Sequence, residues 1–238
     1  MNKFNIFIFG TSIFAVVFGT ITKTSEHNKI NQNYILTYFD APAVGEALRF
    51  LLSYGNLDWV DKRIQLRQWV NLKHTMPFGQ MPSLEYDGKL AHQSVAIARY
   101  LAKQVNLTGN NDWENLEIDA AVDTITDLRL VLVAYKYEKD PIIKENKKGP
   151  LFNVTLPFYL ERLEAQAKRN RGYLAAEKLT WADLFFVSFL DYFNWLVNKD
   201  IIAEAPTLKK LNQTVCEIPN IKAWIQSRPP VNFNMFSL

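Results

Sequence analysis

The sequence is poor in the residues that build disulfide or metal-bound frameworks. Among 238 residues there is one cysteine, Cys216, so no disulfide can form within the chain. A thiolate zinc site needs several cysteines, and three histidines are too few for us to expect a multi-histidine site. The chain also lacks a large excess of positive or negative charge, because it has 27 basic and 24 acidic residues. The net charge of +3 is too small to indicate nucleic-acid binding. What remains is ordinary globular composition, with 48% hydrophobic and 21% charged residues.

One long uncharged run stands apart at the N-terminus. Lys3 is followed by Phe4 to Ile21 without a charged residue, a pattern typical of a secretory signal. A bilayer is spanned by ~20 apolar residues, so an uncleaved membrane anchor over residues 4–21 is one alternative, and a gene-model artefact is another. We predict that residues 1–32 are a signal peptide or signal anchor plus linker, and that the protein is secreted, with a cytoplasmic location as the alternative. Three glycosylation sequons, which matter only after export, begin at Asn106, Asn153 and Asn212.

Residues 33–110 alternate strand and helix patterns. β-branched and aromatic runs indicate strands, apolar residues at helical spacing indicate helices, and Asp87-Gly88 indicates a tight hairpin turn. A β-α-β crossover requires its two strands to be parallel, and the hairpin then adds an antiparallel edge. We expect strands over residues 34–39 and 59–64, a helix over 46–54, hairpin strands over 83–86 and 89–92, and a helix from Ser94.

Residues 111–238 show no strong strand pattern and predict an all-helical domain. Thr180 and Asp183 form a variant of the capping box in front of an apolar run, which indicates a helix start. Pro206 and Pro219 each lie where proline is tolerated best, in the first turn of a helix. We expect helices over residues 113–137, 151–167 and 184–196, and two more beginning at the two prolines.

Five segments in this order resemble the cytosolic-type glutathione transferases, and among them the sigma class. They are Leu36–Phe39, Met76–Pro82, His92–Leu101, Val122–Thr124 and Leu179–Asp183. The resemblance implies an α/β plus all-α fold, in which a thioredoxin-like domain precedes an all-helical domain. It also implies a homodimer that uses glutathione as co-substrate, adds it to small apolar electrophiles and reduces hydroperoxides.

Tyr38 is the predicted catalytic residue. The glutathione thiol has a pKa near the free cysteine value of about 8.5, and only the thiolate is a good nucleophile. A tyrosine hydroxyl remains protonated at neutral pH and can donate a hydrogen bond to that sulfur. The resemblance implies this role for Tyr38, whereas the residue alone would be interpreted as an ordinary strand aromatic.

Two short segments are predicted to bind glutathione. In the family, a cis bond at the position of Met81–Pro82 turns the preceding backbone towards the cysteinyl unit, and Gln80 lies beside it. Gln93 and Ser94 precede and begin a helix, whose free N–H groups favour a carboxylate. The resemblance implies that the γ-glutamyl carboxylate binds there. The alternative role for Ser94 is that of a simple helix cap.

Three further residues are predicted from matching family positions. Trp69 and Lys73 would contact the glycyl end of glutathione, with Lys73 paired to its carboxylate. Asp127 would reach the amino group of glutathione bound in the partner subunit. Without the resemblance, Lys73 and Asp127 would be interpreted as solvated surface charges.

The chain also departs from the prostaglandin synthase of the family. Val44 stands where that enzyme has an arginine, Ala134 stands near its tryptophan wall, and Thr126 replaces one of three metal-binding aspartates. We therefore expect no specific metal. The alternatives to a general transferase are a glutathione-dependent prostaglandin-type isomerase and a non-catalytic, crystallin-like or ligand-binding protein.

Overall fold

The structure is a computed structural model that describes residues 33–231 and 233. The segment expected to be a signal or anchor, residues 1–32, lies outside the described residues. Within the described part of the chain, no helix is long and apolar enough to cross a membrane.

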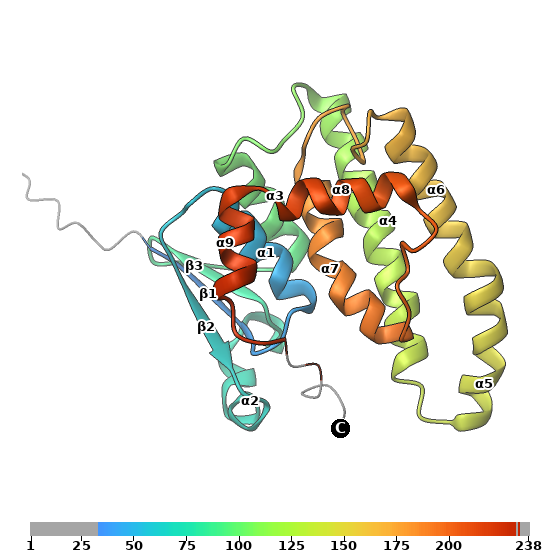
Figure 1. The fold of residues 1–238 in the computed structure, drawn as a ribbon. Coiled ribbons are helices and arrows are strands. Elements are labelled where there is room, and N and C mark those ends of the chain that lie inside the picture. Colours follow the sequence, from blue (N-terminus) through green and yellow to red (C-terminus); the bar gives the residue numbers. More distant parts are fainter. Residues whose placement is uncertain (1–32, 232, 234–238) are drawn as a thin grey trace, which may run out of the picture. The chain divides into compact units, whose positions relative to one another are not determined.

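The first half alternates strands and helices as expected (Figure 1). Its elements are β1 (Tyr34–Phe39), α1 (Ala43–Tyr54), β2 (Trp59–Ile64), α2 (Leu66–Leu72), β3 (Ser83–Tyr86), β4 (Lys89–His92) and α3 (Ser94–Gln104), with 3-10 turns at Lys73–Thr75 and Pro77–Gly79.

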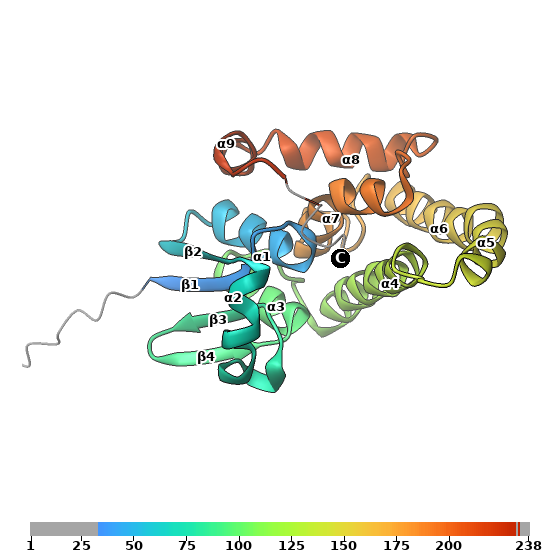
Figure 2. The ribbon, with the colours of Figure 1, turned by 90° about the horizontal axis from the view of Figure 1, so that it is seen from below.

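The four strands form one sheet in the order β2-β1-β3-β4. β1 runs parallel to β2 and antiparallel to β3, and β3 and β4 form the hairpin, so the predicted strand directions are confirmed. Figure 2 shows α1 and α3 on the side of the sheet that faces the C-terminal helices. The C-terminal end of β1, where Tyr38 lies, is thereby held against the start of α1.

The described residues of the second half form helices and connecting loops, without a strand. Its elements are α4 (Asp112–Lys136), α5 (Pro141–Pro150), a single π-helical turn (Leu151–Thr155), α6 (Leu156–Arg169), α7 (Trp181–Val197), α8 (Pro206–Cys216) and α9 (Pro219–Ser227). This is the α/β plus all-α fold that the sequence predicted.

Helix α7 forms the centre of the core. It packs against α1 and α4, and almost all of its side chains are buried. Its fully buried phenylalanines, among them Phe186 and Phe189, each contribute roughly 1.5–3 kcal/mol through burial. The predicted capping box is present, because the Asp183 carboxylate accepts the backbone N–H of Thr180 at 2.7 Å. Asp183 also accepts the N–H of Leu174 at 2.8 Å, so the cap ties α7 to the preceding loop.

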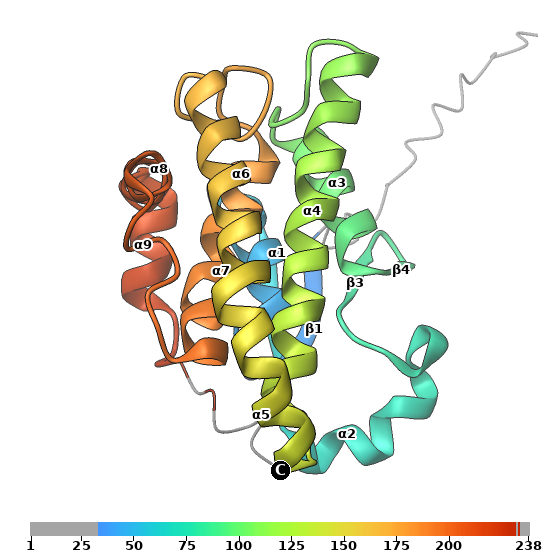
Figure 3. The ribbon, with the colours of Figure 1, turned by 90° about the vertical axis from the view of Figure 1, so that its right-hand side faces the viewer.

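Two helices, α2 and α5, are not among the expected elements. They are only seven and ten residues long, and neither contains a buried residue. The helix expected over residues 151–167 begins instead with the π-helical turn after Pro150 and ends at Arg169. A proline lacks the backbone N–H that bonds the carbonyl four residues earlier, so Pro157 leaves the carbonyl of Asn153, inside the π-helical turn, without its regular helical partner. Figure 3 shows α5 and α6 following one another beside α4.

Candidate active site

The ring of Tyr38 is held tightly at the end of β1. Only 5% of this residue is exposed. A Cβ placed on Gly45, in the first turn of α1, would lie 2.2 Å from ring atom Cδ1, so only glycine leaves room for the ring. The Arg49 guanidinium lies over the ring of Tyr38, 5.9 Å from the ring centroid. Sheet and helix together therefore fix the position of the ring.

Arg49 also fixes the backbone around Tyr38. The side chain is completely buried, and it donates hydrogen bonds to the carbonyl oxygens of Ala41 at 2.7 Å and Phe39 at 3.1 Å. It also forms ion pairs of 3.1 Å with Glu46 and with Asp61. A buried arginine with all these partners holds the β1–α1 loop in one conformation.

Glu46 extends this network to the end of the chain. Its second carboxylate oxygen accepts hydrogen bonds from the Trp224 indole and from Arg228, each at 2.8 Å. Trp224 belongs to α9, and Arg228 follows it directly. The C-terminal helix is therefore bound to the loop that positions Tyr38.

The hydroxyl of Tyr38 is suited to donate a hydrogen bond at neutral pH. Burial raises the pKa of Tyr38 to about 12, although the positive charges of Arg49 and Arg129 and a backbone hydrogen bond at Val44 oppose the shift. The phenol therefore keeps its proton while a neighbouring thiol, with an ordinary pKa near 8.5, can lose one.

A cavity of about 300 Å³ opens beside Tyr38. Most of the predicted site residues line it, although three separate segments of the chain supply them. The predicted lining residues are Tyr38, Gln80, Met81, Pro82, Gln93 and Ser94. The sequence did not assign the others, which are Val44, Pro77, Phe78, His92 and Arg129.

The two predicted glutathione-binding segments have distinctive backbones. The Met81–Pro82 peptide bond is cis, as predicted. Gln93 has a φ of +71°, a conformation that is uncommon for a residue with a side chain, and α3 begins at the next residue. The Ser94 hydroxyl makes no hydrogen bond to another described residue, so the structure gives no support to its role as a simple cap. Gln93 and Ser94 line the cavity at the start of α3, and the first N–H groups of a helix have no partner within the helix.

Three predicted residues do not line this cavity. Trp69 on α2 packs edge-on against Phe39, with ring centroids 5.5 Å apart. Lys73 is exposed in the turn after α2, and Asp127 is exposed on α4. Their proposed contacts would lie at the rim of the site or in another subunit.

Two models of one protein family match the chain. The glutathione S-transferase N-terminal domain matches residues 35–103, and the glutathione S-transferase C-terminal domain matches residues 126–228. A glutathione S-transferase of Anopheles gambiae is 50% identical over 197 residues, which cover 83% of this chain and 97% of that protein. The chain belongs to the glutathione S-transferase family.

Prostaglandin synthases of this family are also similar to the chain. The hematopoietic prostaglandin D synthase of Homo sapiens is 34% identical over 197 residues, covering 83% of this chain and 97% of that protein. The solved structure of prostaglandin synthase D of Nilaparvata lugens superposes with a TM-score of 0.80 and 43% identity, covering 83% of this chain and 99% of that one. Both transferases and synthases are thus relatives over nearly their whole length.

Arg129 is the one charged residue among the lining residues of the cavity to which the sequence assigned no role. α4 buries Val122, Ile125 and Leu132 at helical spacing, and Arg129 lies on the same side, one turn after Ile125. In the sequence, Arg129 lies among apolar residues at helical spacing, and this placement could have marked it as a residue that faces the interior. The remaining unassigned residues of the cavity are apolar or aromatic, and Phe78 stacks on His92 at 5.0 Å.

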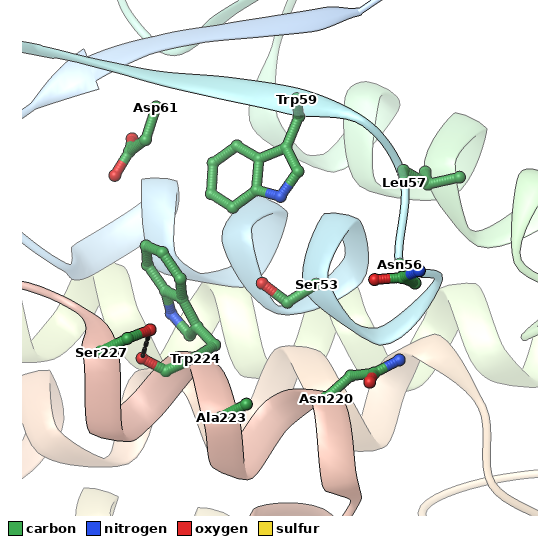
Figure 4. A pocket seen from close by; sticks show the side chains of 9 residues that line it. All are labelled: Ser53, Asn56, Leu57, Trp59, Asp61, Asn220, Ala223, Trp224 and Ser227. Atoms are coloured by element: carbon green, nitrogen blue, oxygen red, sulfur yellow. Dashed lines mark hydrogen bonds between the residues drawn. The ribbon is translucent and has the colours of Figure 1, made fainter.

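A second cavity, of about 380 Å³, lies between α1, β2 and α9 (Figure 4). Trp59 and Trp224 face each other there, with centroids 5.3 Å apart. The carboxylate that lines this cavity belongs to Asp61, which is already paired with Arg49 at 3.1 Å and with Arg63 at 2.7 Å. The one carboxylate of this cavity is therefore already paired, and the cavity beside Tyr38 remains the candidate active site.

Proposed function

We propose that the protein activates the thiol of glutathione and adds it to electrophiles, and that it reduces hydroperoxides with the same thiolate. The observation that carries the proposal is the buried, protonated Tyr38 hydroxyl at the wall of a cavity lined by Gln80–Pro82, Gln93 and Ser94. A hydrogen bond from this hydroxyl favours the thiolate over the thiol. The bound sulfur is then a nucleophile near neutral pH.

The remaining glutathione contacts are proposed from the matching family positions. The γ-glutamyl carboxylate binds at the N-terminus of α3, where free N–H groups and the helix dipole favour an anion. The backbone of Met81 binds the cysteinyl unit as an added strand would. Trp69 and Lys73 take the glycyl end, because both come from the connection between β2 and β3 that borders the site.

The test of the main proposal is Tyr38→Phe. Loss of a hydrogen bond to a charged acceptor costs about 1.5–3 kcal/mol, which corresponds to a fall of roughly 10- to 150-fold in turnover near pH 6.5. The pKa of bound glutathione should rise towards its free value, and part of the rate should return at higher pH. An ultraviolet titration of the bound thiolate in both proteins measures this shift. Coinciding curves with unchanged turnover would show that another group activates the thiol.

A homodimer of the sigma-class type completes the proposed site. Asp127 lies on an exposed stripe of α4 that also presents the apolar side chains Trp113, Leu116 and Leu130. A second copy that covered this stripe would remove apolar surface from water. Asp127 would then be close enough to another molecule to serve the glutathione bound there. We expect no metal at this interface, because Thr126 supplies no carboxylate.

Prostaglandin-type isomerisation is the second candidate function. It is favoured by the identity to named prostaglandin synthases, and opposed by Val44 and Ala134, which replace an arginine and a tryptophan. Conversion of a prostaglandin endoperoxide in the presence of glutathione tests it. Glutathione binding without either activity would indicate the third candidate, a non-catalytic binding protein.

For the N-terminus we propose a signal over residues 1–32, followed by a glutathione-binding domain over residues 33–110 and a helical domain over residues 111–238. The support is the uncharged run after Lys3. N-terminal sequencing of native protein should find a start between about residues 20 and 33. A start at Met1 in a cytosolic fraction would contradict export.

A further inference from the structure

The guanidinium of Arg129 is a positive charge in the wall of the active-site cavity that no described carboxylate pairs with. The residue is half-buried and lines the cavity together with Tyr38. Its side chain forms no hydrogen bond or ion pair with any residue between 33 and 231. The other arginines of that range that are not exposed each pair with at least one carboxylate; they are Arg49, Arg63, Arg99 and Arg228. A partly desolvated cation without a counter-ion is costly, so this position favours an anionic ligand.

The surroundings of Arg129 belong to the helical domain. The guanidinium is within electrostatic reach of the Tyr38 and Tyr192 hydroxyls. Tyr192, from α7, is hydrogen-bonded to Tyr137 at the end of α4. The proposed glutathione-binding residues that line this cavity all come from the first half of the chain, and Asp127 is proposed to serve the glutathione of another subunit. Arg129 and Tyr192 therefore belong to the side of the cavity that is left for the second substrate.

We infer that Arg129 binds a carboxylate of the second substrate, so that the enzyme distinguishes electrophiles that carry a carboxylate from their neutral esters. A guanidinium can form two parallel hydrogen bonds with a carboxylate, which a neutral ester cannot reproduce. The same pairing offsets the repulsion between the substrate anion and the glutathione thiolate. The inference rests on the proposed function, because it assigns a specificity to the same site.

The experiment compares 4-chloro-3-nitrobenzoate with its methyl ester. In both, the thiolate sulfur bonds to the ring carbon, and chloride leaves with the electron pair of the broken carbon–chlorine bond. The measured quantity is the ratio of kcat/KM for the acid to kcat/KM for the ester. In Arg129→Met this ratio should fall roughly 10- to 150-fold, the effect expected of one charge-assisted hydrogen bond. Arg129→Lys keeps the positive charge but cannot form the two parallel hydrogen bonds of a guanidinium, so it should give an intermediate ratio.

The control is Arg162→Met, which removes an exposed guanidinium on α6 that lies over the Phe158 ring. Its acid-to-ester ratio should equal that of the wild type. An equal loss on acid and ester in Arg129→Met would show that Arg129 supports the thiolate, and would overturn the inference. An increase in the KM for glutathione with an unchanged ratio would make Arg129 a glutathione ligand, and would overturn it as well.

Binding measurements separate this inference from the proposed function. The glutathione conjugates of the acid and of the ester are titrated into wild type and Arg129→Met by calorimetry. If the wild type turns over neither substrate, the proposed catalysis is refuted. If Arg129→Met nevertheless loses affinity for the acid conjugate alone, the carboxylate site is retained. A replacement that weakens both conjugates equally, or neither, would refute the carboxylate site.

Discussion

Gly45→Ala should disable the active site through a single methyl group. The added Cβ would lie 2.2, 2.7 and 2.9 Å from atoms Cδ1, Cγ and Cε1 of Tyr38. Ordinary carbon contacts begin at about 3.5 Å, so ring and helix must separate by roughly 1 Å. Arg49 and the β1 backbone enclose the ring, so the displacement must be taken up by the loop that positions the hydroxyl.

The magnitude follows from this geometry. A misplacement of about 1 Å costs on the order of 100-fold in rate, and overpacking of a buried site costs about 1–3 kcal/mol of stability. We therefore expect turnover to fall about 100-fold while the protein remains folded. Conjugation kinetics, ultraviolet titration of the bound thiolate and urea unfolding measure the three effects. The pKa of bound glutathione should rise in Gly45→Ala as it does in Tyr38→Phe.

Gly149→Ala is the matched control. Gly149 lies in α5, and a Cβ added there meets no atom within 4 Å. Alanine has the higher helix propensity, but the ring of Pro150 restricts the residue before it, so this variant should change stability by less than about 1 kcal/mol and leave the kinetics unchanged. A Gly45→Ala protein with wild-type turnover and a wild-type thiolate titration would refute the argument that the space at Gly45 fixes Tyr38.

Three further outcomes are expected. Asp127→Ala should weaken glutathione binding by about 1–3 kcal/mol, and unchanged affinity, or a fully active monomer in ultracentrifugation, would refute the cross-subunit role. Glu164 accepts hydrogen bonds from the backbone N–H groups of Thr207 and Leu208 at 3.1 and 3.0 Å. Burial acts to raise the pKa of Glu164, but these hydrogen bonds and Lys168 together hold the pKa below its usual value. Glu164 therefore stabilises the fold above pH ~4.5 and loses this contribution as pH falls through its folded pKa, so Glu164→Gln should cost about 1–3 kcal/mol in urea unfolding at pH 7 and clearly less near pH 3. Activity should not respond to Mg²⁺ or to a chelator, and a reproducible several-fold effect of Mg²⁺ on glutathione affinity would contradict this expectation.

Helix starts and strand directions were readable from the sequence because they depend on near neighbours. The Thr180–Asp183 cap joins residues three positions apart, and Pro206 and Pro219 begin α8 and α9 as expected. The parallel pairing of β1 and β2 follows from the β-α-β connection, whose helix returns the chain to the end of the sheet where β1 began. α2 and α5 were not expected, because helices of seven and ten residues are too short to display an apolar period over several turns.

The composition of the site was predictable only in part. The resemblance supplied Tyr38, Met81, Pro82 and Ser94, all of which line one cavity in the structure. It could not supply Arg129, because none of the five segments that carry the resemblance contains this residue. The side of α4 that faces the cavity becomes known only when the packing of α4 against α7 is known.

The sequence by itself determined the order of the elements and the two-part fold, and its resemblance to a family indicated Tyr38 as the residue proposed to bear the catalytic hydroxyl. Tertiary structure alone decided what surrounds that hydroxyl. Glu46 meets Trp224 across 178 positions of the chain, and Arg49 becomes wholly buried between β1, β2 and its own helix. Local sequence patterns reflect interactions within about four residues. Burial and charge pairing arise where remote segments pack together, and the periodicity of one segment does not specify which segment it will pack against.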